Sequence, residues 1–294
     1  MRVFYELTHT ACDREIMRCG HEFDVLHPTW DESGRPKPSN VRLVKGPEAR
    51  YDIAIVGFER GLRMCPPGVP MIWKSMVDFG NWPAPSDGIM SRLAAWVALC
   101  QEGVDRFGLR NHKKALYIEP GIDSDVFFGW EGRIERVLTV GNLLAVRQEK
   151  GPQCLSQVAA KIPLSSVGVK NEGIPNVTPL PPAKSMEDLA AIYRSFRAYF
   201  NPCGVVCCAL LEAMATGLPV VTMKPGNFIS LMKHRENCLI AESIEEAVGF
   251  LQLLFKDPEV GKALGKNARE SVKARFHPSR IADRWGKLME RTVS

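Results

Sequence analysis

Several features that would assign the chain to other protein classes are missing from its 294 residues. No apolar run approaches the roughly 20 residues that span a bilayer, and the first apolar stretch, Val3–Leu7, is too short for a secretory signal. We therefore expect a cytoplasmic protein without a transmembrane segment. The nine cysteines contain no Cys-x-x-Cys pair, and no histidine completes a site beside Cys203, Cys207 and Cys208. This pattern favours buried thiols over a metal site.

A Gly-x-Gly-x-x-Gly turn after the first predicted strand is also missing, which argues against a dinucleotide-binding dehydrogenase. Fixed-period repeats and low-complexity tracts are absent as well. What remains is an ordinary globular composition, with 45% hydrophobic and 24% charged residues. The length predicts two domains, at roughly 100 to 200 residues each.

The net charge of +5 is unevenly distributed along the chain. Residues 1–130 contain 16 Lys and Arg against 17 Asp and Glu, so the positive excess lies in the remainder. A basic C-terminal half suits an anionic small ligand such as a nucleotide, and it is only weak support for nucleic acid.

Short apolar runs alternate with stretches of helical spacing along the chain. The strongest strand signals are Tyr51–Gly57 and Arg136–Gly141. Other strands are predicted at 3–7, 21–26, 69–73, 114–118, 166–169, 198–200 and 219–222. Helices are predicted at 11–19, 91–102, 185–196, 207–215 and over most of the chain after 243.

This alternation predicts an α/β protein with parallel sheets built from strand–helix–strand units. Two such series predict two Rossmann-like domains facing across a cleft, one over 1–124 and one over 125–277. Ligands of such sheets bind at the carboxyl ends of the strands. In the second series, Phe200–Gly204 leads directly into a helical stretch, an arrangement whose free N–H groups and helix dipole attract phosphate.

Leu211–Val221 resembles the core motif of family 4 glycosyltransferases, the glycogen-synthase-like superfamily with the GT-B fold. Other segments resemble parts of this family in the expected order, and the resemblance covers about residues 115–294. The short chain is similar to compact, phage-type members. The further matching segments are Tyr117–Asp123, Val140–Gly141 with Lys150–Gly151, Met186–Tyr193, and Arg275–Phe276 with the closing helix.

The resemblance implies a retaining glycosyltransferase that moves a hexose from a UDP- or GDP-sugar to a hydroxyl of a glycan, a lipid or a small molecule. It implies no metal ion and no other cofactor, because basic side chains and a helix N-terminus neutralise the leaving diphosphate. It also implies that residues 278–294 pack back on the first domain, with Ile281, Trp285 and Leu288 on one apolar face. The oligomeric state stays open.

Arg147 and Lys150 are the candidates for the catalytic neutralisation of the diphosphate, since Arg forms paired bonds to phosphate and Lys supplies a compact charge. They lie on the predicted donor loop that begins at Gly141. The family's arginine directly follows this glycine, but Asn142 stands there in this chain. Glu212 is expected to accept hydrogen bonds from the donor ribose hydroxyls.

A second departure concerns the family's other glutamate, eight residues before Glu212. Gly204 occupies that position, and no Asp or Glu lies between residues 188 and 212. Gly204, Val205 and Val206 are expected to bind the donor phosphates through backbone N–H groups. Further donor contacts are expected from Lys224, Gly226 and Asn227.

The first domain is expected to bind the acceptor. Thr8, His9 and Thr10 follow the first strand at its carboxyl end. Asp78 follows the strand at 69–73, where the family often has a histidine, and it is the candidate to orient or deprotonate the acceptor hydroxyl.

Two alternative functions stay open. A phage-type member could act on DNA that carries a hydroxymethylated pyrimidine, although the near-neutral balance over 1–130 gives this little support. The departures at Gly204 and Asn142 are also compatible with a non-catalytic module that binds a nucleotide sugar or a glycan.

Overall fold

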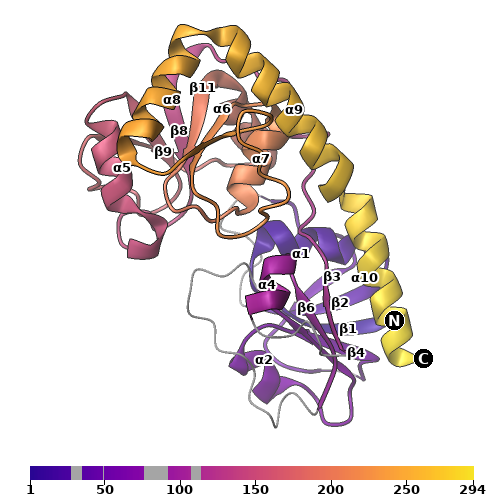
Figure 1. Ribbon diagram of the computed structural model, residues 1–294. Coiled ribbons are helices and arrows are strands. Elements are labelled where there is room, and N and C mark those ends of the chain that lie inside the picture. Colours follow the sequence, from indigo (N-terminus) through magenta and orange to yellow (C-terminus); the bar gives the residue numbers. More distant parts are fainter. Residues whose placement is uncertain (28–34, 49, 76–91, 107–113) are drawn as a thin grey trace. The chain divides into compact units, whose positions relative to one another are not determined.

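The computed structural model describes residues 1–27, 35–48, 50–75, 92–106 and 114–294. The chain divides into two compact units, each built on a parallel sheet (Figure 1). Unit 1 comprises Met1–Gly121 and Phe276–Ser294, and unit 2 comprises Ile122–Arg275. Two parallel sheets with flanking helices confirm the predicted α/β class with two Rossmann-like domains.

The sheet of unit 1 has the order β3-β2-β1-β4-β5-β6-β7, and every described pairing is parallel. The direction in which the chain adds strands reverses between β1 and β4. In open α/β sheets this switch point opens a crevice at the carboxyl ends of the strands, where ligands bind. The strands are β1 (Arg2–Glu6), β2 (Glu22–Leu26), β3 (Val41–Val44), β4 (Ile53–Val56), β5 (Met71–Lys74), β6 (Leu93–Ala98) and β7 (Ala115–Tyr117).

Both faces of this sheet are covered by helices. Alternate residues of β1 enter different cores, with Tyr5 on one face and Phe4 on the other. On the Tyr5 face lie α1 (Thr10–Ile16), the 3₁₀ turn η1 (Met17–Cys19) and α10 (Pro278–Val293), which inserts Trp285 into the core. On the Phe4 face lie α2 (Glu59–Met64) and α4 (Gln101–Arg106).

The sheet of unit 2 has the order β10-β9-β8-β11-β12-β13, with its switch point between β8 and β11. Figure 1 shows α5 (Pro152–Ala159) and α8 (Ile244–Lys256) on one side of this sheet, and α6 (Met186–Ser195) and α7 (Cys208–Thr216) on the other. The chain continues through α9 (Pro258–Phe276). The strands are β8 (Ile134–Val140), β9 (Leu164–Val167), β10 (Val177–Leu180), β11 (Phe196–Asn201), β12 (Val220–Met223) and β13 (Leu239–Ala241).

One predicted element is wrong. Residues 91–102 were expected to form a helix, but Leu93–Ala98 is strand β6, between β5 and β7. All residues of β6 except Ala94 are buried. A strand covered on both faces shows a continuous apolar run without alternation, and such a run cannot be distinguished from a buried helix by periodicity.

None of the helices in the described ranges combines the length and the apolar character that crossing a bilayer requires.

Candidate functional site

Three loops meet at the carboxyl edge of the unit 2 sheet, around its switch point. They follow β8 (residues 141–151), β11 (202–207) and β12 (224–227). A side-chain carbon built at Gly151 would lie 3.2 Å from Pro202, so the first two loops are in close contact. The Gly226 amide donates to the Gly204 carbonyl at 2.9 Å, which joins the second loop to the third. The structure therefore brings together segments that were predicted separately as parts of the donor site.

Gly204 explains the absence of the family's glutamate at its position. Its φ of +64° lies in the left-handed region, where side chains are disfavoured. A Cβ at this position would also overlap the carbonyl oxygen of Lys224. The close approach of the two loops therefore requires glycine.

Asn227 fastens the same two loops through its side chain. Its Oδ1 accepts from the Val206 amide at 2.7 Å, and its Nδ2 donates to the Val206 carbonyl at 3.0 Å. The Val206 amide, which was predicted to bind phosphate, is therefore bonded to Asn227 in this structure. The Val205 carbonyl is likewise bonded, to Nδ2 of Asn201 at 3.2 Å. Asn227 belongs to the site, but its amide group organises the loop.

Hydrogen bonds to β9, to the residue Val169 that follows it, and within the loop itself hold the loop after β8. The Gly141 amide donates to Val167 in the sheet at 3.0 Å. Oδ1 of Asn142 accepts from the Val169 amide at 3.0 Å, and its carbonyl accepts from the Lys150 ammonium at 2.5 Å. Asn142 therefore joins the loop after β8 to the segment after β9. The arginine of the family pattern would instead place a positive charge at this position.

Lys150 interacts electrostatically with Cys203 and Cys207 of the second loop. Burial lowers the pKa of Lys150, and the neighbouring charge of Arg147 lowers it further, while Cys207 and Cys203 act in the opposite direction. The Arg147 guanidinium pairs with Glu149 at 2.5 Å, and both side chains are partly exposed. The lowered pKa reflects the burial of the ammonium and the neighbouring positive charge of Arg147.

Glu212 lies on the buried side of α7, with 3% of its surface exposed. Its Oε2 lies 3.4 Å from the hydroxyl of Tyr193 on α6, and this hydroxyl donates to the Ala209 carbonyl at 2.9 Å. Tyr193 was not among the predicted site residues, because an aromatic residue at helical spacing is usually part of the core. Lys224, by contrast, is exposed and pairs with Glu242 at 3.2 Å.

In unit 1, the loop between β1 and α1 lies at the switch point of that sheet. The Asp13 carboxylate accepts from the Thr8 amide at 2.7 Å and from the His9 amide at 3.0 Å. Thr10 is the first residue of α1. Asp78, the predicted base, lies outside the described residues.

The neighbouring loop, between β4 and α2, is held by another carboxylate. Glu6 at the end of β1 accepts from the amides of Gly57, Phe58 and Gly61 at 3.1, 2.8 and 2.9 Å. Burial raises the pKa of Glu6, and these three bonds only partly offset it. Asp13 and Glu6 thus accept hydrogen bonds from backbone amides in the loops on both sides of the unit 1 switch point.

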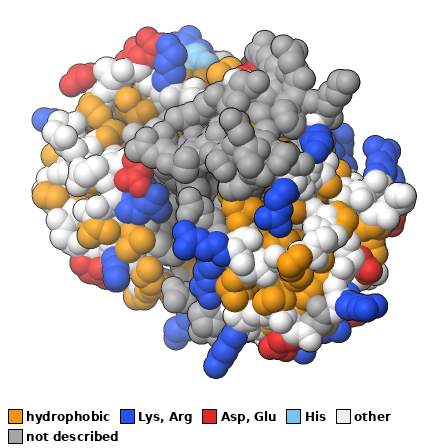
Figure 2. Space-filling model, turned by 90° about the horizontal axis from the view of Figure 1, so that it is seen from below, with side chains coloured by type: hydrophobic (Ala, Val, Ile, Leu, Met, Phe, Trp, Pro, Cys, Tyr) orange, Lys and Arg blue, Asp and Glu red, His pale blue; other side chains and the backbone are white. Residues whose placement is uncertain are grey.

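Positive charge does not gather into one continuous surface in the part that Figure 2 displays. Lys and Arg side chains lie there singly or in small groups among apolar and neutral ones. Four basic residues lie within sequence positions 106–114, and two of them, Arg110 and Lys113, lie outside the described residues. Lys114 bonds the Leu93 carbonyl at 2.5 Å.

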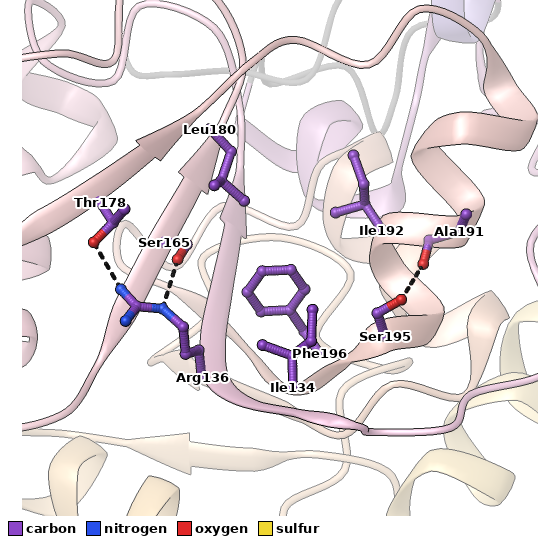
Figure 3. A pocket seen from close by; sticks show the side chains of 9 residues that line it. All are labelled: Ile134, Arg136, Ser165, Thr178, Leu180, Ala191, Ile192, Ser195 and Phe196. Atoms are coloured by element: carbon purple, nitrogen blue, oxygen red, sulfur yellow. Dashed lines mark hydrogen bonds between the residues drawn. The ribbon is translucent and has the colours of Figure 1, made fainter.

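A separate pocket of about 560 Å³ lies in unit 2, over β8, β9, β10 and α6. Figure 3 shows the Arg136 guanidinium reaching across its wall to the hydroxyls of Ser165 and Thr178, at 2.9 and 2.7 Å, with the Phe196 ring beside Ile134. No predicted site residue lines this pocket. The pocket is therefore distinct from the three-loop site.

The sequence of this region matches a known family model. Residues 168–271, which include the second and third loops, match the model for glycosyl transferases group 1. A segment of 79 residues is 33% identical to N-acetyl-alpha-D-glucosaminyl L-malate synthase of Bacillus anthracis. It covers 26% of this chain and only 20% of that relative's length.

The fold of the whole chain is similar to that of solved glycosyltransferases. Sucrose-phosphate synthase from Thermosynechococcus elongatus matches over 99% of this chain and 98% of its own, with a TM-score of 0.74 and 15% identity. HepE from Anabaena, solved with UDP-glucose, matches over 99% of this chain and 100% of its own, with a TM-score of 0.73 and 14% identity. The chain therefore has the GT-B fold of these proteins, and the group 1 match lies in unit 2.

Proposed function

We propose that the protein transfers a hexosyl group from a UDP-hexose to an acceptor hydroxyl, with retention at the anomeric carbon. The observation that carries the proposal is the meeting of three loops at the unit 2 switch point, with the Lys150 ammonium beside them. The group 1 match and the UDP-glucose complex of a protein with the same fold support this choice of donor.

In the proposed reaction the bond from the anomeric carbon to the diphosphate breaks, and the acceptor oxygen bonds to that carbon on the same face, so that the configuration is retained. Negative charge then develops on the departing diphosphate, and fixed positive charge stabilises it. Lys150 and Arg147 provide this charge, together with the N-terminal end of α7. Because these groups belong to the chain, the proposed reaction requires neither a metal ion nor another cofactor.

The donor's nucleoside is assigned to α7 and the acceptor to unit 1. Glu212, which Tyr193 holds at the inner side of α7, accepts the ribose hydroxyls in this proposal. The acceptor is a glycan, a lipid or a small molecule with a free hydroxyl. Thr8, His9 and Thr10 contact it, and Asp78 takes the proton that the hydroxyl loses.

Binding of nucleotides tests the proposed donor. We expect UDP and UDP-glucose to raise the melting temperature more than GDP or ADP, because a ligand that binds only the folded state stabilises it with saturation. Lys150→Met and Arg147→Ala should each abolish most of the UDP shift. Arg133→Ala is the matched control, because Arg133 is an exposed cation of unit 2 paired with Glu131. Equal UDP shifts in all three variants would remove Lys150 and Arg147 from the site.

A non-catalytic nucleotide-sugar-binding module is the second candidate, and the geometry of Gly204 favours it. No side chain fits at this position, so the carboxylate of the family pattern is missing for a structural reason. Slow hydrolysis of UDP-glucose without acceptor distinguishes the candidates. Binding with neither hydrolysis nor transfer favours the module, and either reaction favours the enzyme.

A further inference from the structure

A buried ion pair lies beside the β1–α1 loop of unit 1. The ammonium of Lys74, the last residue of β5, contacts Oδ1 of Asp13 in α1 and donates to the Tyr5 hydroxyl at 2.8 Å. The side chains of Lys74 and Asp13 are 1% and 0% exposed. The ammonium also lies 5.1 Å from the centre of the Tyr5 ring.

The second oxygen of the same carboxylate holds the loop. Oδ2 of Asp13 accepts from the Thr8 and His9 amides at 2.7 and 3.0 Å, and from the Thr8 hydroxyl at 3.1 Å. One carboxylate oxygen is therefore held by the cation and the other holds two consecutive backbone amides. This loop is the segment that follows β1 at the switch point, where ligands of such sheets bind.

Stability alone does not account for a pair buried in this way. Removing two charges from water costs free energy that their attraction often fails to recover, and apolar replacements of similar volume are often neutral or stabilising. The surroundings leave the loop little freedom, since a Cβ at Gly57 would lie 2.7 Å from the Thr8 side chain and 2.9 Å from the Lys74 carbonyl. The pair thus lies where a small displacement would move the predicted acceptor residues.

We propose that Asp13 and Lys74 are positioning residues that fix the backbone of Thr8 and His9 for the acceptor. This inference rests on the proposed transferase function. The Lys74 ammonium contacts one oxygen of the Asp13 carboxylate, and the other oxygen accepts from the loop, because a carboxylate offers two acceptor oxygens and no donor. The cation acts on the loop through the carboxylate and touches neither substrate.

The test uses two single variants and their combination in the full-length protein. In Asp13→Asn, the amide Oδ1 can still accept from the loop, but the NH₂ group faces the Lys74 ammonium, donor against donor. In Lys74→Met, the carboxylate is left buried without its cation. The double variant Asp13→Asn/Lys74→Met removes both conflicts, because Met is apolar and the Asn oxygen can still accept from Thr8 and His9.

Transfer from UDP-glucose is measured with L-malate, glucose and glycerol as acceptors, using the one that the unaltered protein accepts best. We expect both single variants to lose about 10- to 100-fold in kcat/KM for the acceptor, mainly through KM, as misplaced contact groups do. The double variant should recover most of this loss. Hydrolysis of UDP-glucose and the UDP-induced melting shift should stay unchanged in all three variants.

Asp24→Asn is the matched control, because Asp24 is equally buried in unit 1 but bonds Arg2, Arg42 and Tyr51. It should lower the melting temperature and leave the acceptor KM unchanged. The proposal is overturned if the double variant is no better than Asp13→Asn, since the charge itself would then be required. It is also overturned if Asp24→Asn raises KM as much. An unaltered protein that binds no UDP, or that neither hydrolyses UDP-glucose nor transfers from it, refutes the proposed function instead.

Discussion

Replacing Gly204 by alanine has two costs in stability, one from the backbone conformation and one from steric overlap, at the centre of the three-loop site of unit 2. The left-handed φ of +64° costs an alanine about 1–2 kcal/mol relative to glycine. The overlap of its Cβ with the Lys224 carbonyl forces the loops after β11 and β12 apart, at about 1–3 kcal/mol for overpacking. The sum is about 2–5 kcal/mol of unfolding free energy.

Gly173→Ala isolates the first cost. Gly173 has a φ of +90° in the same unit, and a Cβ there would meet no atom within 4 Å. We therefore expect Gly173→Ala to lose only about 1–2 kcal/mol and to keep the full UDP shift.

Chemical denaturation gives the two free energies, and the UDP-induced melting shift reports on the donor site. Gly204→Ala should lose more stability than Gly173→Ala and most of the UDP shift. Gly204→Glu, which restores the glutamate of the family pattern, should not restore a working site, because its Cβ meets the same carbonyl. Equal losses in Gly204→Ala and Gly173→Ala, with UDP binding intact in both, would refute the reasoning.

Three further predictions concern single side chains. Burial and the charge of Arg147 lower the pKa of Lys150 below the ordinary 10.5 of lysine. UDP affinity, measured by calorimetry, should therefore fall as pH rises through this lowered pKa, because the ammonium loses its charge. In Lys150→Met the affinity should not fall in this pH range. Burial tends to raise the pKa of Asp24, but its bonds to Arg42, Tyr51 and Arg2 outweigh burial and lower it. The stability contributed by Asp24 is therefore present above its unfolded pKa of about 3.9 and is lost as pH falls through the lower folded value; urea midpoints measured from pH 5 to pH 2.5 should fall less in Asp24→Asn. Asn227→Ala leaves the buried amide and carbonyl of Val206 without their side-chain partners. The free energy of unfolding, measured by chemical denaturation, should fall by about 2–3 kcal/mol. A fall below about 0.5 kcal/mol would show that water replaces both bonds.

Much of the fold could be predicted from local patterns, because a strand that ends at glycine and a helix with one apolar face leave signals within a few residues. Such signals indicated β4, β8, α6 and α7 close to their observed bounds. Strand β6 was misread because its burial on both faces depends on neighbours elsewhere in the chain. The three loops at the switch point of the unit 2 sheet were also indicated by pattern, since glycine and cationic residues follow the strands there.

The contacts inside the site could not be predicted, because they join residues far apart in sequence. Asn142 bonds Val169, and Asn227 bonds Val206. Lys74 and Asp13 are separated by 61 residues, and neither is distinctive in its own segment. Only the folded chain brings the end of β5 and α1 close enough for them to pair.

The sequence by itself determined the α/β class and the region around Leu211–Val221 that carries the glycosyl transferases group 1 match. These properties follow from periodicity and from a contiguous motif. The tertiary structure decided why glycine stands at position 204 and what Asn142 binds. It also decided which buried carboxylate holds the β1–α1 loop. The physical reason is that backbone conformation and steric room at one residue are set by atoms that the folded chain brings from elsewhere, and no local pattern encodes them.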